Sequence, residues 1–131
     1  HSSFLLSFFV YKGIMPYRGW CFEKRKRGDR MSTEYQVENR TLYIRLDGEL
    51  DHHLAKKVRR QCEVILKSYP IRDIEFDFSK SGFMDSSGVG VILGRYKQVQ
   101  PMGGTVSISH MNEAVKRVAH MAGLNRIIKE K

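Results

Sequence analysis

Residues 74–93 read IEFDFSKSGFMDSSGVGVIL, and three different patterns follow one another within this short stretch. Every second residue from Ile74 to Phe78 is apolar, which is typical of a strand with one buried face. Residues 79–85 are expected to form a loop, and Asp85 with the two serines behind it is a good start for a helix. A strand, a loop and a helix in such close succession indicate an α/β protein.

Strand-like alternation also occurs on both sides of this stretch. It predicts two strands upstream, at 35–37 and 42–46, and two short strands downstream, at 106–108 and 127–128. Helical crossovers separate the later strands, so these strands should be parallel with right-handed connections. The first two strands can pair as an antiparallel hairpin at an edge of the sheet.

Helical spacing of apolar residues predicts three helices. They run from the N-cap Asp51 to about Tyr69, from Asp85 to Pro101, and from the N-cap Asn112 to Gly123. The residues expected to face the core are Leu54, Val58, Cys62, Ile65 and Leu66 in the first helix, Val89, Ile92, Leu93, Tyr96 and Val99 in the second, and Val115, Val118, Ala119 and Ala122 in the third. The predicted order is β-β-α-β-α-β-α-β, a single α/β domain with a mixed, mostly parallel sheet covered by helices.

Composition excludes several classes of protein. The chain has 131 residues, of which 41% are apolar and 28% charged, so it is long enough for one globular domain and is not a disordered chain. No run approaches the roughly 18 apolar residues of a membrane-spanning helix. Cys21 and Cys62 cannot form a disulfide framework, and a reduced cytoplasmic protein is expected.

The first thirty residues differ from the rest in charge. Residues 1–30 contain seven Lys/Arg and two Asp/Glu, with a basic cluster at 24–27. We interpret this cluster as a solvated tail and expect no direct binding of nucleic acid or membrane, because no RNA-binding motif accompanies it. Met31 offers a natural start, and the codons AGG-GGU-GAU for residues 27–29 would form a bacterial ribosome-binding sequence before it. The hypothesis is that 1–30 is a translated leader and 31–131 is the domain.

Motifs for enzymatic or metal chemistry are incomplete. His52 and His53 point about 100° apart on a helix and have no further Cys/His partners, so no metal site is expected. Ser86 lies at a strand-to-helix turn but lacks the glycine of a nucleophile elbow and a partnered base; Glu113 and His120 are a poor substitute pair. No lysine completes a phosphate-binding loop at 88–90. The sequence therefore predicts neither catalytic residues nor a cofactor.

Residues 83–90, FMDSSGVG, combine two hydroxyls and a carboxylate with glycines in the first turns of a helix. One interpretation is a capping cluster, with glycines that let the helix approach the sheet closely. A further interpretation is that Ser86 is exposed beside a flat surface of small residues that another protein's active site can reach. A phosphate there lies near the positive end of a helix, so it should alter docking without unfolding the domain.

Two segments carry a resemblance to a known family. Residues 48–53, GELDHH, and residues 83–97, FMDSSGVGVILGRYK, are similar to the anti-sigma factor antagonists with a STAS domain, especially those for the sporulation sigma factor F of spore-forming Firmicutes. Residues 114–117 and 123–124 extend the similarity, which covers about 35–129. Family members usually continue into another helix, so the resemblance also implies a helix missing after Lys131.

The resemblance implies a regulatory binding protein and not an enzyme. Its phosphoacceptor would be Ser86, and its partner a cytoplasmic anti-sigma factor that is also a serine kinase. The unmodified antagonist would bind this kinase and release sigma factor F; phosphorylation would end binding, and a serine phosphatase would restore it. The expected partner-binding residues are Asp51, Asp85, Ser86, Ser87 and Gly88.

Three alternatives remain open from the sequence. The first is an antagonist for a different sigma factor, such as the one for general stress. The second is a small-ligand or nucleotide-binding STAS module, with the turn at 85–88 as an anion site. The third is an enzyme with Ser86 as nucleophile, against which the lack of a partnered base argues.

Overall fold

The computed structural model describes residues 14–17, 20–23 and 33–131. In this part of the chain the strands are β1 (Ile14–Tyr17), β2 (Trp20–Glu23), β3 (Glu34–Glu38), β4 (Thr41–Asp47), β5 (Asp73–Lys80), β6 (Val106–Ser109) and β7 (Lys129–Glu130). The helices are α2 (His52–Ser68), α3 (Ser86–Val99) and α4 (Glu113–Met121), with 3-10 turns at Gln100–Met102 and Leu124–Arg126. From β3 onward the order is β-β-α-β-α-β-α-β, as predicted.

The strands form one mixed sheet in the order β1-β2-β3-β4-β5-β6-β7. The β3–β4 hairpin is antiparallel, whereas β4–β5, β5–β6 and β6–β7 pair in parallel, so the predicted fold class is confirmed. Asn39 and Arg40 join the hairpin, and both have positive φ (51° and 62°), the conformation that matches the twist of a two-residue hairpin turn. β2 continues the sheet beyond β3 through two residue pairs.

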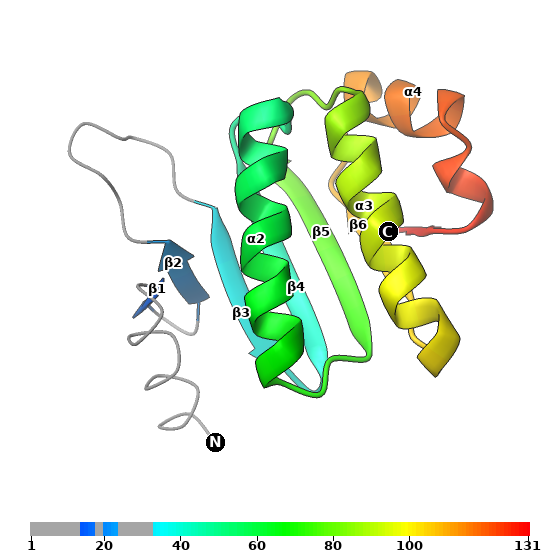
Figure 1. The fold of residues 1–131 in the computed structure, drawn as a ribbon. Helices are drawn as coiled ribbons and strands as arrows, with labels where there is room; N and C mark the ends of the chain where they lie inside the picture. Colours follow the sequence, from blue (N-terminus) through cyan, green and yellow to red (C-terminus); the bar gives the residue numbers. More distant parts are fainter. Residues whose placement is uncertain (1–13, 18–19, 24–32) are drawn as a thin grey trace.

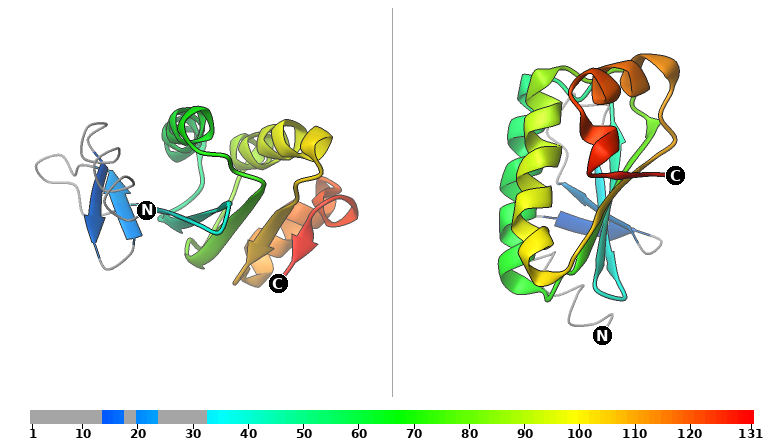
Figure 2. Two further views of the ribbon diagram at one scale, coloured as in Figure 1. Left: turned by 90° about the horizontal axis from the view of Figure 1, so that it is seen from below. Right: turned by 90° about the vertical axis from the view of Figure 1, so that its right-hand side faces the viewer.

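Helices α2 and α3 lie side by side over one face of the sheet (Figures 1 and 2). On that face the alternate residues of β4 and β5 are buried, with Leu42, Ile44 and Phe76 fully enclosed. Four α2 residues complete this core, namely Ala55, Val58, Cys62 and Ile65. All four residues of β6 are buried, so this strand is covered on both faces.

The buried face of α3 differs from the sequence-based prediction. Ile92 and Val99 are buried as expected, but Val89, Leu93 and Tyr96 are only half-buried. The other buried residues of this helix are Gly88, Val91 and Arg95. Apolar residues occur on all sides of α3, so periodicity alone does not select its inner face. Packing against both the sheet and α2 makes that selection.

The C-terminal part of the fold shows two smaller differences. In α4, Val115 and Ala119 are buried, whereas Val118 is half-buried and Ala122 lies exposed just beyond the helix. The last strand is β7 and not 127–128, because a 3-10 turn intervenes after Gly123, whose φ is 78°. The strand prediction was therefore two residues too early.

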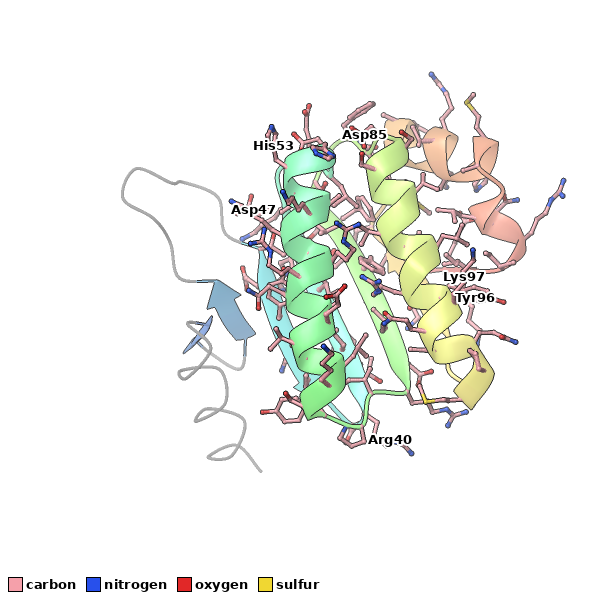
Figure 3. The ribbon with its side chains drawn as sticks, viewed as in Figure 1. Arg40, Asp47, His53, Asp85, Tyr96 and Lys97 are labelled. Atoms are coloured by element: carbon pink, nitrogen blue, oxygen red, sulfur yellow. The ribbon has the colours of Figure 1, made fainter. Side chains whose placement is uncertain are left out.

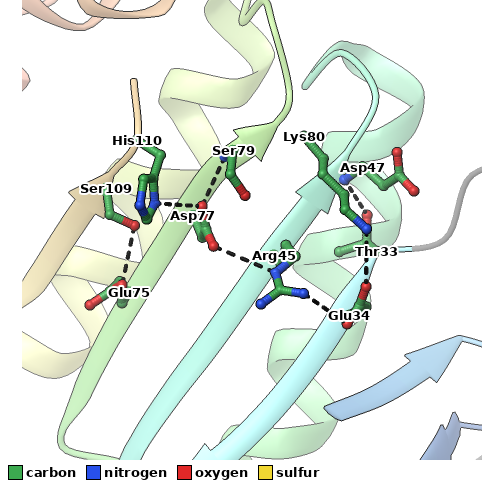
Figure 4. Close-up of polar contacts among 10 residues, drawn as sticks. All are labelled: Thr33, Glu34, Arg45, Asp47, Glu75, Asp77, Ser79, Lys80, Ser109 and His110. Atoms are coloured by element: carbon green, nitrogen blue, oxygen red, sulfur yellow. Dashed lines mark hydrogen bonds and ion pairs between the residues drawn. The ribbon is translucent and has the colours of Figure 1, made fainter. Parts of the chain in front are cut away.

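The opposite face of the sheet, over β3 to β5, carries charged side chains that pair across the strands (Figure 4). Arg45 lies 3.5 Å from a carboxylate oxygen of Glu34 and 3.6 Å from one of Asp77. Lys80 approaches Glu34 at 3.8 Å, and His110 Nδ1 lies 3.0 Å from Asp77 Oδ1. This face is therefore polar, and the apolar core lies on the helix side.

Asp77 has the clearest electrostatic perturbation of this network. Burial acts to raise the pKa of its carboxyl group, but hydrogen bonds from Ser79 and the neighbouring His110 outweigh burial and hold the pKa below its ordinary value of 3.8. The Ser79 backbone N–H donates to Asp77 Oδ1 over 2.8 Å. The charged form of Asp77 is thus the favoured form in the folded protein.

Most of residues 1–30 lies outside the described residues, and so does the basic cluster at 24–27. The leader interpretation of this segment therefore stays a prediction; β1 and β2 fall within it and were not expected. None of the helices in the described part of the chain is long and apolar enough to span a bilayer.

Candidate functional site

The site is built where two loops leave the sheet side by side. One loop follows β4 and the other follows β5, and both lead into a helix (Figure 1). The Gly48 N–H donates to the carbonyl of Lys80 at 3.0 Å, and the Leu50 N–H donates to the carbonyl of Phe83 at 2.9 Å. The Asp85 N–H then donates back to the carbonyl of Leu50 at 3.3 Å. These bonds hold the starts of α2 and α3 next to each other.

Both helices begin with an aspartate N-cap, as the sequence predicted. Asp51 Oδ1 accepts a hydrogen bond from the Leu54 N–H at 3.0 Å. Asp85 Oδ1 accepts from the N–H groups of Ser87 and Gly88 at 2.8 and 3.3 Å. Each carboxylate thereby satisfies backbone donors that a helix start leaves without partners. Asp85 is drawn at the start of α3 in Figure 3, at the same end of the molecule as His53 and opposite Arg40.

Ser86 is the first residue of α3 and its side chain is exposed. Ser87 beside it is half-buried, and Gly88 is buried. The structure therefore brings Asp51, Asp85 and Ser86 to one end of the fold. Gly88 lies beneath this surface.

Gly88 explains why a glycine stands in this helical turn. A Cβ atom at Gly88 would lie 2.6 Å from Met84 Cγ and 2.8 Å from Leu50 Cγ, both in fully buried side chains. Gly90 has no such neighbour within 4 Å of the corresponding position. Gly88 therefore allows α3 to pack closely on the loops that leave the sheet, and not on the strands themselves as predicted, whereas Gly90 has no such role.

The start of α4 also contacts this region, and the sequence did not predict this contact although it predicted Asn112 as the N-cap. Asn112 caps α4 by accepting from the Val115 N–H at 2.8 Å, and its Nδ2 donates to the Gly82 carbonyl at 2.9 Å. Asn112 thus ties the loop that precedes Ser86 to α4. The local sequence predicts the capping role of Asn112. No local pattern predicts its bond to Gly82, because the two residues lie thirty positions apart in the chain.

Other candidate groups do not assemble into a catalytic or metal centre. The rings of His52 and His53 lie 5.9 Å apart at an interplanar angle of 64°, and both residues are exposed on the first turn of α2. His120 Nε2 pairs with Glu130 at 2.9 Å. Among the residues that the structure describes, no group of three or more His, Cys, Asp or Glu side chains could hold a metal ion.

Comparison with known proteins identifies the family. The STAS domain model matches residues 32–131. An anti-sigma F factor antagonist of Paenibacillus polymyxa is 38% identical over 100 residues, covering 75% of this chain and 86% of that protein. The anti-sigma F factor antagonist of Lysinibacillus sphaericus is 32% identical over 67% of this chain and 75% of its own length. The anti-sigma-B factor antagonist of Bacillus subtilis strain 168 is 28% identical over 71% and 83%.

Solved structures agree with this result. The unphosphorylated form of the anti-sigma factor antagonist SpoIIAA superposes with a TM-score of 0.68 at 30% identity, covering 76% of this chain and 87% of that one. The phosphorylated form of SpoIIAA from Bacillus superposes with a TM-score of 0.61 at 29% identity, covering 78% and 91%. The relatives are regulatory antagonists, so the prediction that this protein is not an enzyme is confirmed. The chain belongs to the STAS domain family, and within that family it is an anti-sigma factor antagonist.

Proposed function

We propose that this antagonist controls the sporulation sigma factor F through a phosphorylation switch at Ser86. The unphosphorylated protein binds an anti-sigma factor that is also a serine kinase, and sigma factor F is released. Phosphorylation of Ser86 by that kinase ends binding, and a serine phosphatase restores it. The antagonist and its kinase partner act in the cytoplasm.

The observation that carries the proposal is the position of Ser86. It is an exposed hydroxyl at the first residue of α3, on a turn that hydrogen bonds fix on both sides. A kinase needs such a side chain to project from the surface into its own active site. The relatives at 38% and 32% identity are anti-sigma F factor antagonists, and the solved structures that this fold matches include SpoIIAA in both unphosphorylated and phosphorylated forms.

Phosphorylation at this position should change docking and leave the fold intact. A phosphate adds about −1.5 to −2 charge at neutral pH, and the N-terminus of a helix tolerates negative charge. The N–H groups of Ser87 and Gly88 already bond to Asp85, so the phosphate would remain at the surface. A partner that covers Ser86 would have to strip water from this dianion, which opposes binding.

The expected partner-binding residues take different roles in this proposal. Ser86 lies in the contact, with Ser87 at its edge. Asp51 caps α2 and Asp85 caps α3, and both residues remain partly accessible. Gly88 lies beneath the contact surface and affects it indirectly, because any side chain there would displace Leu50 and Met84.

The test is mass spectrometry after incubation with a purified anti-sigma kinase and ATP. The wild-type protein should gain one phosphate on Ser86, and Ser86→Ala should gain none. Ser68→Ala, the matched control at an exposed serine that ends α2, should be phosphorylated like wild type. A phosphate on another residue would overturn the assignment of Ser86. Binding without phosphorylation would identify a constitutive antagonist.

A second candidate is an antagonist of a general stress sigma factor, which the similarity to anti-sigma-B factor antagonists favours. Binding measured in parallel against anti-sigma-F and anti-sigma-B kinases separates the two. We expect at least about ten-fold tighter binding to the F-type kinase, equivalent to about 1.4 kcal/mol. The reverse preference would assign the protein to the stress response.

A further inference from the structure

We propose that Phe83 is an apolar anchor that inserts into a pocket of the anti-sigma partner. This inference rests on the proposed function and adds a residue to the partner surface. Among the described residues the exposed large apolar side chains are Phe83, Met102, Met121 and Ile127. Phe83 is the one that precedes Ser86, by three positions, and it leaves 40% of its surface exposed.

The backbone around Phe83 is held in place. Its carbonyl accepts from the Leu50 N–H at 2.9 Å, and the preceding carbonyl of Gly82 accepts from Asn112 Nδ2 at 2.9 Å. The following residue, Met84, is fully buried and bridges to Leu50. An aromatic ring on such a fixed segment loses little conformational freedom when a partner covers it, which favours tight binding.

This setting distinguishes Phe83 from an isolated exposed hydrophobic residue, which needs no special explanation. Met102 and Met121 expose 66% and 83% of their surfaces, and both have flexible side chains without a ring. Aromatic side chains near the centre of an interface, enclosed by contacts that exclude water, carry a large share of binding energy. The partner chemistry that fits Phe83 is therefore a closed apolar pocket beside the kinase active site.

The same arrangement links docking to the switch. If Phe83 is enclosed, the Ser86 hydroxyl lies at the margin of a region without water. A neutral hydroxyl can be buried there with one hydrogen bond, whereas a phosphate dianion loses its hydration at that margin. Docking through Phe83 would thus present Ser86 to the kinase and favour dissociation of the antagonist once Ser86 is phosphorylated.

The test measures binding of the unphosphorylated protein to its anti-sigma kinase by calorimetry. We expect Phe83→Ala to raise Kd by about ten-fold or more. Met121→Ala, the matched control at a more exposed apolar site, should stay within about two-fold of wild type. Phe83→Tyr keeps the ring and the packing but carries a hydroxyl into the pocket, so it should also weaken binding. Thermal melts check that each variant is folded.

Phosphorylation kinetics give a second measurement. Because the proposed role of Phe83 is docking and its side chain supplies no group to phosphoryl transfer, Phe83→Ala should raise KM for the antagonist and leave kcat unchanged. Wild-type affinity in both Phe83 variants would overturn the anchor and leave the proposed function intact. A wild-type protein that binds no anti-sigma kinase would remove the proposed function, and the anchor with it.

Discussion

Replacing Gly88 with alanine tests how closely α3 approaches the loops beneath it. The new Cβ atom would lie 2.6 Å from Met84 Cγ, 2.8 Å from Leu50 Cγ and 2.9 Å from Leu50 Cδ2. Both neighbours are fully buried, so neither can turn into solvent to make room. Real Cβ contacts are essentially never shorter than 3.0 Å, and the packing must therefore shift.

The size of the effect follows from two opposing contributions. Overpacking a closed site destabilises a protein by about 1–3 kcal/mol. Removing a glycine from a helix returns about 0.5–1 kcal/mol. Taking the middle of each range, we expect Gly88→Ala to be less stable than wild type by about 1 kcal/mol, which lowers the midpoint of thermal unfolding by about 4–8 °C.

Gly90→Ala is the matched control, because it lies in the same helix and a Cβ there meets no atom within 4 Å. It should gain about 0.5–1 kcal/mol from helix propensity alone. Urea unfolding followed by circular dichroism gives both free energies. If Gly88→Ala proves as stable as Gly90→Ala, then Leu50 and Met84 relax without penalty and the close-packing argument fails.

Three further changes test other parts of the fold. Asp85→Ala removes the cap of α3 and should lower the free energy of unfolding by about 1 kcal/mol, whereas Asp85→Asn keeps a capping oxygen and should lose less than half of that. Equal losses of the two variants in urea unfolding would contradict the capping role. Asn112→Asp keeps the cap of α4 but loses the N–H that is donated to the Gly82 carbonyl. Hydrogen-exchange protection of amides in the loop between β5 and α3 should therefore fall by about five-fold or more, while α4 stays protected. Unchanged protection of this loop would show that the bond is dispensable. The pKa of Asp77 is lowered on folding, so the stability that its carboxylate contributes is complete above the unfolded pKa of about 3.8 and is lost as pH falls through the folded pKa. Asp77→Asn should therefore cost about 0.5 kcal/mol at pH 7, and this cost should shrink as the pH falls below about 3.8; a cost that stays constant in acid would refute this sign.

Local patterns were sufficient for the elements of this fold. The alternation at 42–46, the alternation at 74–78 and the N-caps Asp51, Asp85 and Asn112 all correspond to observed strands and helix starts. Each depends on residues within about one helical turn or one strand. The pleat of a strand produces alternating apolar residues, and the unpaired N–H groups at a helix start favour a capping side chain. The segments 48–53 and 83–97 together were similarly sufficient to indicate the family, because the residues of each motif are contiguous.

The tertiary structure decided what depends on neighbours distant in the chain. It selected the face of α3 that includes the buried Arg95, and it separated the packed Gly88 from the open Gly90. It also joined the Leu50 and Phe83 segments and tied Gly82 to Asn112. Periodicity along one element cannot encode these contacts, because they arise only when separate elements pack and each side chain meets atoms that the local sequence does not contain.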